Sequence, residues 1–251
     1  MQSQEQPASD AAYVIFGATG GIGSALSRRL AAAGANLLLA ARDREKLEAL
    51  ASETGTPFFA ADVTNGDEVQ ACFDDAVSRF GSVSGAANCV GSVFLKPAHI
   101  TSDEEWTEVL EKNLGSSFRI VRSGARAMMK NGGSIVLFST AAARIGIANH
   151  EAIAAAKGGV TGLALSAAAT YAARGSGVNV MAPGLVETPA PARITGNVAR
   201  RKASLAMHPL GRLGRPEDVA AMAEWLLQPA NDWLTGQTFG IDGGLGRVRS
   251  R

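Results

Sequence analysis

The sequence predicts an α/β fold in which a doubly wound, seven-stranded parallel sheet carries helices on both faces within one domain. Two observations support this prediction. Short apolar runs alternate along the chain with longer amphipathic or alanine-rich segments, which is the pattern of parallel strands joined by crossover helices. In addition, a glycine-rich turn separates the first expected strand from the first expected helix.

Seven segments are expected to be strands, because each is short, apolar and bounded by polar or turn-forming residues. They cover Tyr13–Phe16, Asn36–Ala41, Pro57–Ala61, Gly85–Asn88, Ser134–Ser139, Val178–Ala182 and Thr238–Ile241. Helices are expected from the glycine-rich turn to about Ala33, over Arg42–Thr54 and Gly66–Phe80, and over the alanine-rich Asn149–Arg174. The domain is expected to span residues 12–246, with a substrate lid at about 189–209 and frayed tails at 1–11 and 247–251.

The composition limits the classes of protein and partner. Of the 251 residues, 46% are hydrophobic, which is enough to bury one core. The 24 Lys and Arg nearly balance the 23 Asp and Glu, so no nucleic-acid partner is expected. The N-terminus lacks the basic start and apolar run of a signal peptide, and no apolar run reaches membrane-spanning length, so we expect a cytoplasmic protein without a membrane partner. Two cysteines are too few for a disulfide framework or a zinc site, and no metal is expected.

The turn after the first strand, Gly17-Ala18-Thr19-Gly20-Gly21-Ile22-Gly23, is the expected cofactor-binding element. Its glycines allow a tight turn and let the backbone approach a pyrophosphate closely. The helix that follows offers free N–H groups and the positive end of its dipole to the phosphates. This arrangement predicts a Rossmann-type dinucleotide site, and a turn made only for packing is the alternative.

The end of the second strand predicts that NADP(H) binds in preference to NAD(H). Rossmann proteins that prefer NAD place an acid here, which bonds the ribose hydroxyls and would repel a 2′-phosphate. This chain has Ala41 at that position, and Arg42 follows with a forked donor suited to phosphate. Asp43 is expected to begin the next helix. The alternative is that Arg42 is a solvated residue at the helix start.

Several motifs, in the right order, make residues 12–246 similar to the short-chain dehydrogenase/reductase family. The family's Thr-Gly-x-x-x-Gly-x-Gly pattern is matched by Gly17, Gly21 and Gly23, with Phe16 in place of the threonine. The segment Asn88–Gly91 stands where the family has Asn-Asn-Ala-Gly. The resemblance implies that the cofactor contacts Gly17, Thr19, Gly20, Gly21, Ile22, Gly23, Arg42, Asp62, Val63, Asn88, Gly91, Lys157, Pro183, Gly184, Val186 and Thr188.

The same resemblance implies a small-molecule substrate and self-association. The family pairs subunits through the long helix. The small residues Gly162, Ala164, Ala167 and Ala168 are therefore expected to form a close helix contact in a homodimer or homotetramer.

The catalytic residues that the resemblance implies are only partly present. The family uses a serine, a tyrosine and a lysine, with Tyr-x-x-x-Lys on the long helix. Lys157 is present, and Asn113 resembles the active-site asparagine that holds a helix bulge and a water. Ile153 stands at the tyrosine position and Thr140 at the serine position. Isoleucine cannot exchange a proton, whereas the threonine hydroxyl can still donate a hydrogen bond.

His150 is the candidate replacement for the missing tyrosine. It precedes Lys157 by nearly two helical turns, so both are expected on one helix face, and histidine titrates near neutrality. The string over residues 149–157 resembles the enoyl-thioester reductase branch of the family, in which the tyrosine stands seven residues before the lysine. The expected catalytic set is Asn113, Thr140, His150 and Lys157. The alternative is that His150 is a partly exposed residue at a helix start, beside a capping Asn149.

The sequence leaves three functions open. The first is an NADP(H)-dependent oxidoreductase that reduces a carbonyl or conjugated enone of a small organic substrate, with the proton from His150 or from a water chain through Lys157 and Asn113. The second is a catalytically weak NADP(H)-binding protein. The third is a non-redox lyase or isomerase with His150 as base. The fold does not decide among them.

Overall fold

The seven expected strands all occur and lie parallel in one sheet. The computed structural model describes residues 11–188 and 198–249. In that part the strand order is β3-β2-β1-β4-β5-β6-β7, which reverses direction between β1 and β4. Such a reversal opens a crevice at the carboxyl ends of the strands. The bounds are β1 Ala12–Phe16, β2 Asn36–Ala41, β3 Phe58–Ala60, β4 Gly85–Asn88, β5 Gly133–Phe138, β6 Ser176–Pro183 and β7 Thr238–Ile241.

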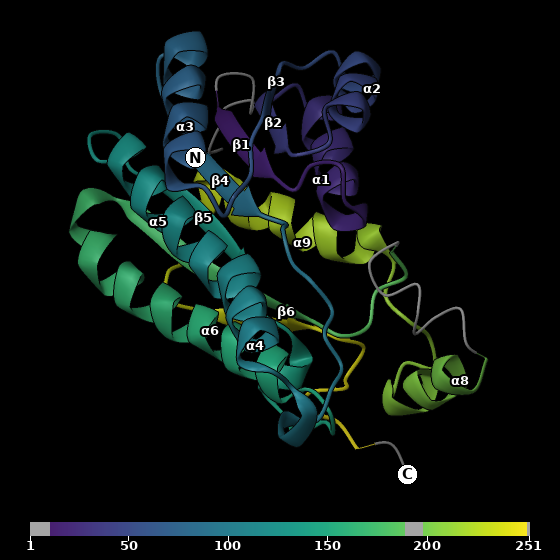
Figure 1. The fold of residues 1–251 in the computed structure, drawn as a ribbon. Helices are drawn as coiled ribbons and strands as arrows, with labels where there is room; N and C mark the ends of the chain where they lie inside the picture. The colour runs from purple at the N-terminus through teal and green to yellow at the C-terminus, as the bar shows by residue number, and fades with distance from the viewer. Residues whose placement is uncertain (1–10, 189–197, 250–251) are drawn as a thin grey trace.

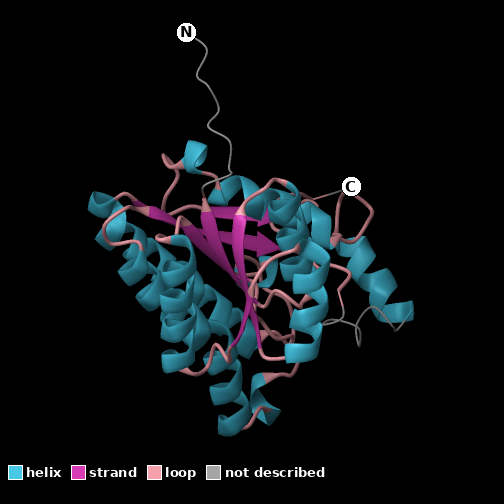
Figure 2. Ribbon diagram, turned by 90° about the horizontal axis from the view of Figure 1, so that it is seen from above, coloured by secondary structure: helices cyan, strands magenta, loops and turns pink. Residues whose placement is uncertain are grey.

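Helices cover both faces of the sheet (Figures 1 and 2). One face carries α1 (Gly21–Ala32), α2 (Arg44–Thr54) and α9 (Pro216–Leu227), and the other carries α3 (Gly66–Phe80), α5 (Ser116–Ala127) and α6 (Glu151–Tyr171). α4 (Asp103–Leu110) packs against α6. α8 (Val198–Met207) stands apart from the sheet, beyond its carboxyl edge (Figure 1). The fold is therefore the doubly wound α/β architecture that the sequence predicts.

The central strand β1 shows why two helical layers are needed. All five of its residues are buried, and successive side chains enter opposite cores. Tyr13 and Ile15 pack in the layer with α1 and α9, whereas Val14 and Phe16 pack in the layer with α3, α5 and α6. A strand buried on both faces is a continuous apolar run, which is why the sequence predicts it so clearly.

α6 directs most of the small residues expected at a subunit contact toward its own core. Ala164, Ala167 and Ala168 are only 1%, 6% and 4% exposed and pack beside the strands, so the expectation that they meet another subunit is wrong. The small side chains let α6 lie close to its own sheet. Gly162 is exposed, and association through the exposed side of α6 stays a prediction. By length and composition alone, Glu151–Arg174 is also a candidate membrane span in the described residues, but its buried stripe is part of this core.

Several element boundaries differ from the expected ones. Ala11, just before β1, is not part of a frayed tail, because it is buried and its carbonyl accepts from Asn36 N at 3.0 Å. α6 begins at Glu151, with His150 as its N-cap. Asn149 is not the cap, because its φ of 64° is left-handed, a conformation that asparagine tolerates. α2 begins at Arg44 rather than at Arg42, and the expectation that Asp43 starts this helix is confirmed, since Asp43 caps it and accepts from Lys46 N.

The expected lid lies partly outside the described residues. Residues 189–197 and 1–10 are in the part of the chain that the structure does not describe. The remainder of the lid forms α8 and the turn that follows it. At the other end, the expected C-terminal tail begins with a turn in which Val248 N donates to Gly244 O at 2.8 Å.

The glycine turn after β1 has no space for side chains, and this gives a first prediction. Gly17 has a φ of 73°, and a Cβ on Gly23 would lie 2.1 Å from Gly17 O. We expect Gly23→Ala to lower the free energy of unfolding by at least about 2 kcal/mol, because the backbone must move to relieve the clash. Gly158→Ala is the matched control: this α6 glycine is exposed with no neighbour within 4 Å, so alanine should raise stability by up to about 1 kcal/mol. Urea unfolding of both variants measures this, and equal stabilities would contradict it.

Candidate active site

A cavity of about 850 Å³ lies at the carboxyl ends of the strands. It is bounded by the glycine turn, the segments after β2, β4, β5 and β6, the start of α6, the end of α8 and the C-terminal loop. Of the expected site residues, it is lined by Gly17, Thr19, Gly20, Gly21, Ile22, Arg42, Val63, Gly91, Thr140, His150, Lys157, Pro183, Gly184, Val186 and Thr188. Gly23, Asp62, Asn88 and Asn113 are not in its lining. The structure thus brings most of the expected cofactor and catalytic residues together.

The N-terminus of α1 is built to receive an anion. The first N–H groups of any helix lack an intrahelical acceptor. α2 and α3 satisfy theirs with the side chains of Asp43 and Asn65, but α1 has Gly20 as its N-cap, without a side-chain hydrogen bond and without an acid in the first turn. A Cβ on Gly21 would lie 2.5 Å from Thr188 Cγ2, so only glycine fits. Bare amides at the positive end of a dipole, in a cradle without side chains, fit the pyrophosphate of a dinucleotide.

Two cations line the cavity at the far side of this cradle. Arg42 is 71% exposed and lies 3.7 Å from Asp62 across a weak ion pair. Lys46 lies one helical turn further on and pairs with Asp43 at 2.6 Å. An anionic ligand in the cavity can reach both cations, because the side chains are 71% and 72% exposed. Lys46 is not among the site residues expected from the sequence. Its position three residues after the capping Asp43 could have predicted the ion pair that places it beside Arg42.

Asn88 shapes the cavity from behind its wall. The side chain is buried, and its amide nitrogen donates to the hydroxyls of Ser116 and Ser117 on α5 at 3.3 and 3.1 Å. Its Oδ1 accepts from Val90 N at 3.2 Å. Asn88 therefore fixes the turn after β4 against α5, and the neighbouring Val90 and Gly91 form the wall itself.

Asn113 occupies a helix bulge, as the resemblance implies. Residues Glu111–Gly115 form one π-helical turn between α4 and α5, a feature often found at functional sites. The buried amide nitrogen of Asn113 donates to Val109 O and to Ser92 Oγ, both at 2.9 Å, and its Oδ1 accepts from Ser92 N at 3.2 Å. A Cβ on Gly91 would lie 3.4 Å from both Asn113 Oδ1 and Lys157 Nζ. The asparagine and the lysine therefore face each other across a glycine.

Lys157 is buried at the middle of the cavity wall, with 6% of its surface exposed. Its ammonium donates to Phe138 O at 2.8 Å, and its own carbonyl accepts from Ser139 Oγ at 2.8 Å. Among the described residues no carboxylate pairs with it. Burial lowers the pKa of Lys157 from its ordinary 10.5 to about 8. A lysine in a cavity whose pKa is lowered toward neutral pH is typical of a functional site.

Thr140 and Ile153, the two catalytic positions at which the resemblance implies a departure from the family, both line the cavity. Thr140 follows β5, and its Oγ1 accepts from Ala142 N at 3.3 Å, which leaves the hydroxyl proton to donate elsewhere. Ile153 is 6% exposed and packs with Val109 and the partly buried Phe94. The wall position that the family gives to tyrosine is therefore apolar in this chain.

His150 lies at the cavity beside these residues, at the N-cap of α6. Its Nδ1 is 2.8 Å from Ala148 O. A carbonyl only accepts, so Nδ1 carries a proton and Nε2 is left to exchange one. The residue is not helical, so the expected shared helix face with Lys157 is wrong in detail, but both side chains line one cavity. His150 is therefore both a residue at the helix start and part of the cavity lining, and its role as a proton donor stays a prediction.

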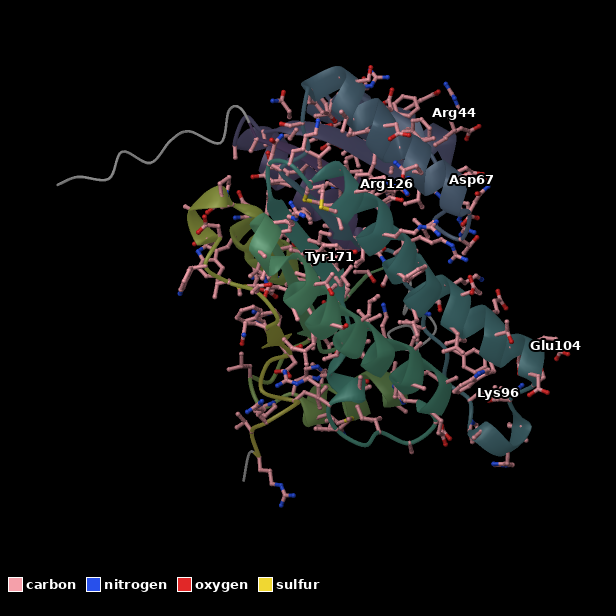
Figure 3. All side chains as sticks on the ribbon, turned by 90° about the vertical axis from the view of Figure 1, so that its left-hand side faces the viewer. Arg44, Asp67, Lys96, Glu104, Arg126 and Tyr171 are labelled. Atoms are coloured by element: carbon pink, nitrogen blue, oxygen red, sulfur yellow. The ribbon has the colours of Figure 1, made fainter. Side chains whose placement is uncertain are left out.

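Neither tyrosine of the chain can stand in for the missing phenol. Tyr13 is buried in β1, where burial and then Glu224 raise the pKa to about 12. Tyr171 is the last residue of α6, at the end opposite His150. Figure 3 shows this separation: Tyr171 lies far along the helix from Lys96, whose N donates to Asn149 O just before α6 begins. Neither tyrosine lines the cavity.

A buried histidine that the sequence reasoning did not single out as functional joins α8 to the segment after β6. His208 is 4% exposed, accepts from Leu185 N at 3.1 Å through Nε2, and donates from Nδ1 to Ser204 O at 2.7 Å. A Cβ on Gly184 would lie 2.6 Å from its Nε2. His208 thus holds Gly184 and Leu185, which line the cavity, in place. No local motif indicates this role, because Leu185 is distant in the sequence and Ser204 contributes only a backbone carbonyl of α8.

A family model described as enoyl-(acyl carrier protein) reductase matches residues 17–246 of this chain. A solved short-chain type dehydrogenase/reductase from Mycobacterium ulcerans has a TM-score of 0.91 at 30% identity, over 96% of this chain and 91% of that one. The chain belongs to the short-chain dehydrogenase/reductase family. Together with its curated relatives, this makes it an oxidoreductase of that type.

Its relatives carry several activities. The 3-oxoacyl-[acyl-carrier-protein] reductase of Vibrio cholerae is 33% identical over 92% of this chain and 96% of its own length. The cis-4-hydroxycyclohexanecarboxylate dehydrogenase of Sinomonas cyclohexanicum is 35% identical over 94% and 96%. A variant of the actinorhodin polyketide ketoreductase, solved with NADPH, has a TM-score of 0.89 at 28% identity over 99% of this chain and all of that one. The family is therefore clear, while the substrate differs among relatives.

The buried Lys157 predicts a pH dependence of stability. A folded-state pKa of about 8 against an ordinary 10.5 means that the unfolded chain binds more protons between these values. The free energy of unfolding therefore gains up to about 3 kcal/mol from this group as pH rises through that window. Lys157→Met should lack this gain. Urea unfolding of both proteins at about pH 7 and about pH 10 measures the difference, since other titrations cancel. Parallel pH profiles would show that Lys157 is not desolvated.

Proposed function

We propose that the protein is an NADP(H)-dependent reductase of a carbonyl or conjugated enone in a small organic substrate. The observation that carries this proposal is a single cavity in which an uncapped helix start and two cations lie at one end, Lys157 lies at the middle, and Thr140 and His150 lie beyond it. The bound nicotinamide would supply a hydride from its C4 to the substrate carbon. The similarity to a ketoreductase solved with NADPH supports the same cofactor.

The residues of this chain would divide the remaining tasks. Arg42 and Lys46 would bind the 2′-phosphate, and the amides of Gly21 and Ile22 the pyrophosphate. Lys157 would donate to the ribose hydroxyls of the nicotinamide half, across Gly91 from Asn113.

Thr140 and His150 would act on the substrate oxygen. The Thr140 hydroxyl proton is free to donate a hydrogen bond to it. As an imidazolium, His150 would give the oxygen its Nε2 proton while Nδ1 keeps its bond to Ala148 O, so the ring need not turn. The partly exposed ring then regains a proton from water. Electrons and protons balance, because hydride and proton together convert the carbonyl to an alcohol.

The cofactor preference is tested by removing the phosphate-binding cations. Because charge-assisted hydrogen bonds contribute about 1.5–3 kcal/mol, Arg42→Ala should raise the Kd for NADPH about 10- to 100-fold and leave that for NADH nearly unchanged. Arg44→Ala is the matched control, since Arg44 pairs with Glu48 outside the cavity lining and should not alter either Kd. Fluorescence titration with both cofactors measures this. Tighter binding of NADH by the wild-type protein would refute the preference.

The role of His150 is tested by His150→Phe. General acid catalysis by a positioned side chain contributes about 10²–10⁴-fold, so turnover of a ketone should fall in that range with the Kd for NADPH unchanged. His99→Phe, on a short helical turn outside the cavity lining, should turn over at the wild-type rate. Adding Ile153→Tyr to His150→Phe should restore turnover in part, because it returns a proton donor to the wall. Wild-type turnover in His150→Phe would mean that the proton comes from water.

A further inference from the structure

The charged groups that line the cavity are unevenly distributed. In the described residues they are Arg42, Asp43 and Lys46 at the adenosine end, and Lys157 at the middle. Beyond Lys157, leaving aside the two histidines, the described lining carries no charged side chain. That half is walled by Val93, Leu95, Ile147, Ile153, Met207 and Leu245. Val93, Leu95 and Met207 are 45%, 41% and 41% exposed, so the apolar surface continues to the mouth.

The polar groups in this half are mostly bound to the protein itself. Ser139 donates to Lys157 O, and both ring nitrogens of His208 are engaged. Besides the hydroxyls of Ser204 on α8 and of Ser92, which accepts from Asn113, the described wall offers a ligand the side chains of Thr140 and His150. The hydroxyls can donate to a carbonyl oxygen, but none of them supplies a charge to pair with an anion.

The described cations of α8 do not reach this half of the cavity, since the exposed Lys202 is not part of its lining. Arg201 pairs with Glu187 at 2.7 Å, and neither residue lines the cavity. When Thr140 and His150 hold the reacting oxygen, a carboxylate or phosphate elsewhere on the substrate would leave water without gaining a cation among the described lining residues of this half, and an unpaired buried charge is strongly disfavoured.

We infer that the substrate is an uncharged, apolar ketone or enone whose reacting oxygen is its one strongly polar atom. The inference rests on the proposed function and adds the substrate class. An alicyclic or aliphatic body would bury its surface against the apolar wall, and each added methylene in contact should improve binding about fourfold. A carboxylate on the same body would meet that wall without a counter-charge.

Three probes of one shape test this class. They are 4-methylcyclohexanone, 4-oxocyclohexanecarboxylate and the methyl ester of the latter, which controls for size without charge. With the wild-type protein and NADPH we expect kcat/KM for the ketone and the ester to exceed that for the carboxylate by at least about 100-fold, because desolvating an unpaired charge is so unfavourable. A carboxylate reduced as well as the ester would overturn the inference.

A charge introduced into the wall supplies the reciprocal test. Met207→Lys places an ammonium at the mouth of the apolar half, and the uncharged Met207→Gln is its matched control. The ratio of ester to carboxylate kcat/KM should fall at least about tenfold in the lysine variant alone. An equal fall in both variants would show that charge does not set the preference. NADPH titration checks that each variant is folded.

Failure of the proposed function gives a different result. If none of the probes consumes NADPH, the reductase proposal fails. The inference is then decided by calorimetric titration of the same three compounds into the protein with NADP⁺. Tighter binding of the methyl and ester compounds supports the apolar site, and equal or tighter binding of the carboxylate overturns it.

Discussion

The parallel pairing of β1 with β4 at the centre of the sheet determines where every group of the cavity lies. Parallel strands bring all their carboxyl ends to one edge, and the order of the strands reverses between these two. The glycine turn follows β1, the Asn88–Gly91 turn follows β4, Thr140 follows β5 and Gly184 follows β6. Residues that are distant in the sequence therefore lie together at this edge, although no local sequence pattern indicates that they are neighbours.

Three buried polar side chains, Lys157, Asn113 and His208, position the residues of the cavity. Lys157 loses most of its hydration, with a single carbonyl as its described partner. Asn113 is held by a π-helical turn, and His208 is held in one tautomer by two backbone groups. Each of these arrangements costs free energy relative to an apolar core but fixes the orientation of a group.

The resemblance implies that Ile153 stands where relatives have a tyrosine, and the proposed mechanism divides the catalytic tasks accordingly. In the proposed arrangement the proton donor moves from the helix to its N-cap, where a backbone carbonyl orients the ring. Ile153 then belongs to the apolar lining and packs with Val109 and Phe94, which do not line the cavity. In the proposed arrangement Ile153 thus supplies no proton and makes the substrate half more apolar, which joins the proposed chemistry to the inferred substrate class.

The sequence by itself determined the fold and the local elements that bound the proposed cofactor end of the cavity, because these depend on local patterns. Buried parallel strands are continuous apolar runs, and the glycine turn and the start of α2 are read from neighbouring residues. Only the tertiary structure decided that Ala164 and its neighbours face their own sheet, that Asn149 is left-handed, that Asn88 acts from behind the wall and that His208 holds the segment after β6. These facts depend on packing between elements far apart in the chain, which no local pattern encodes.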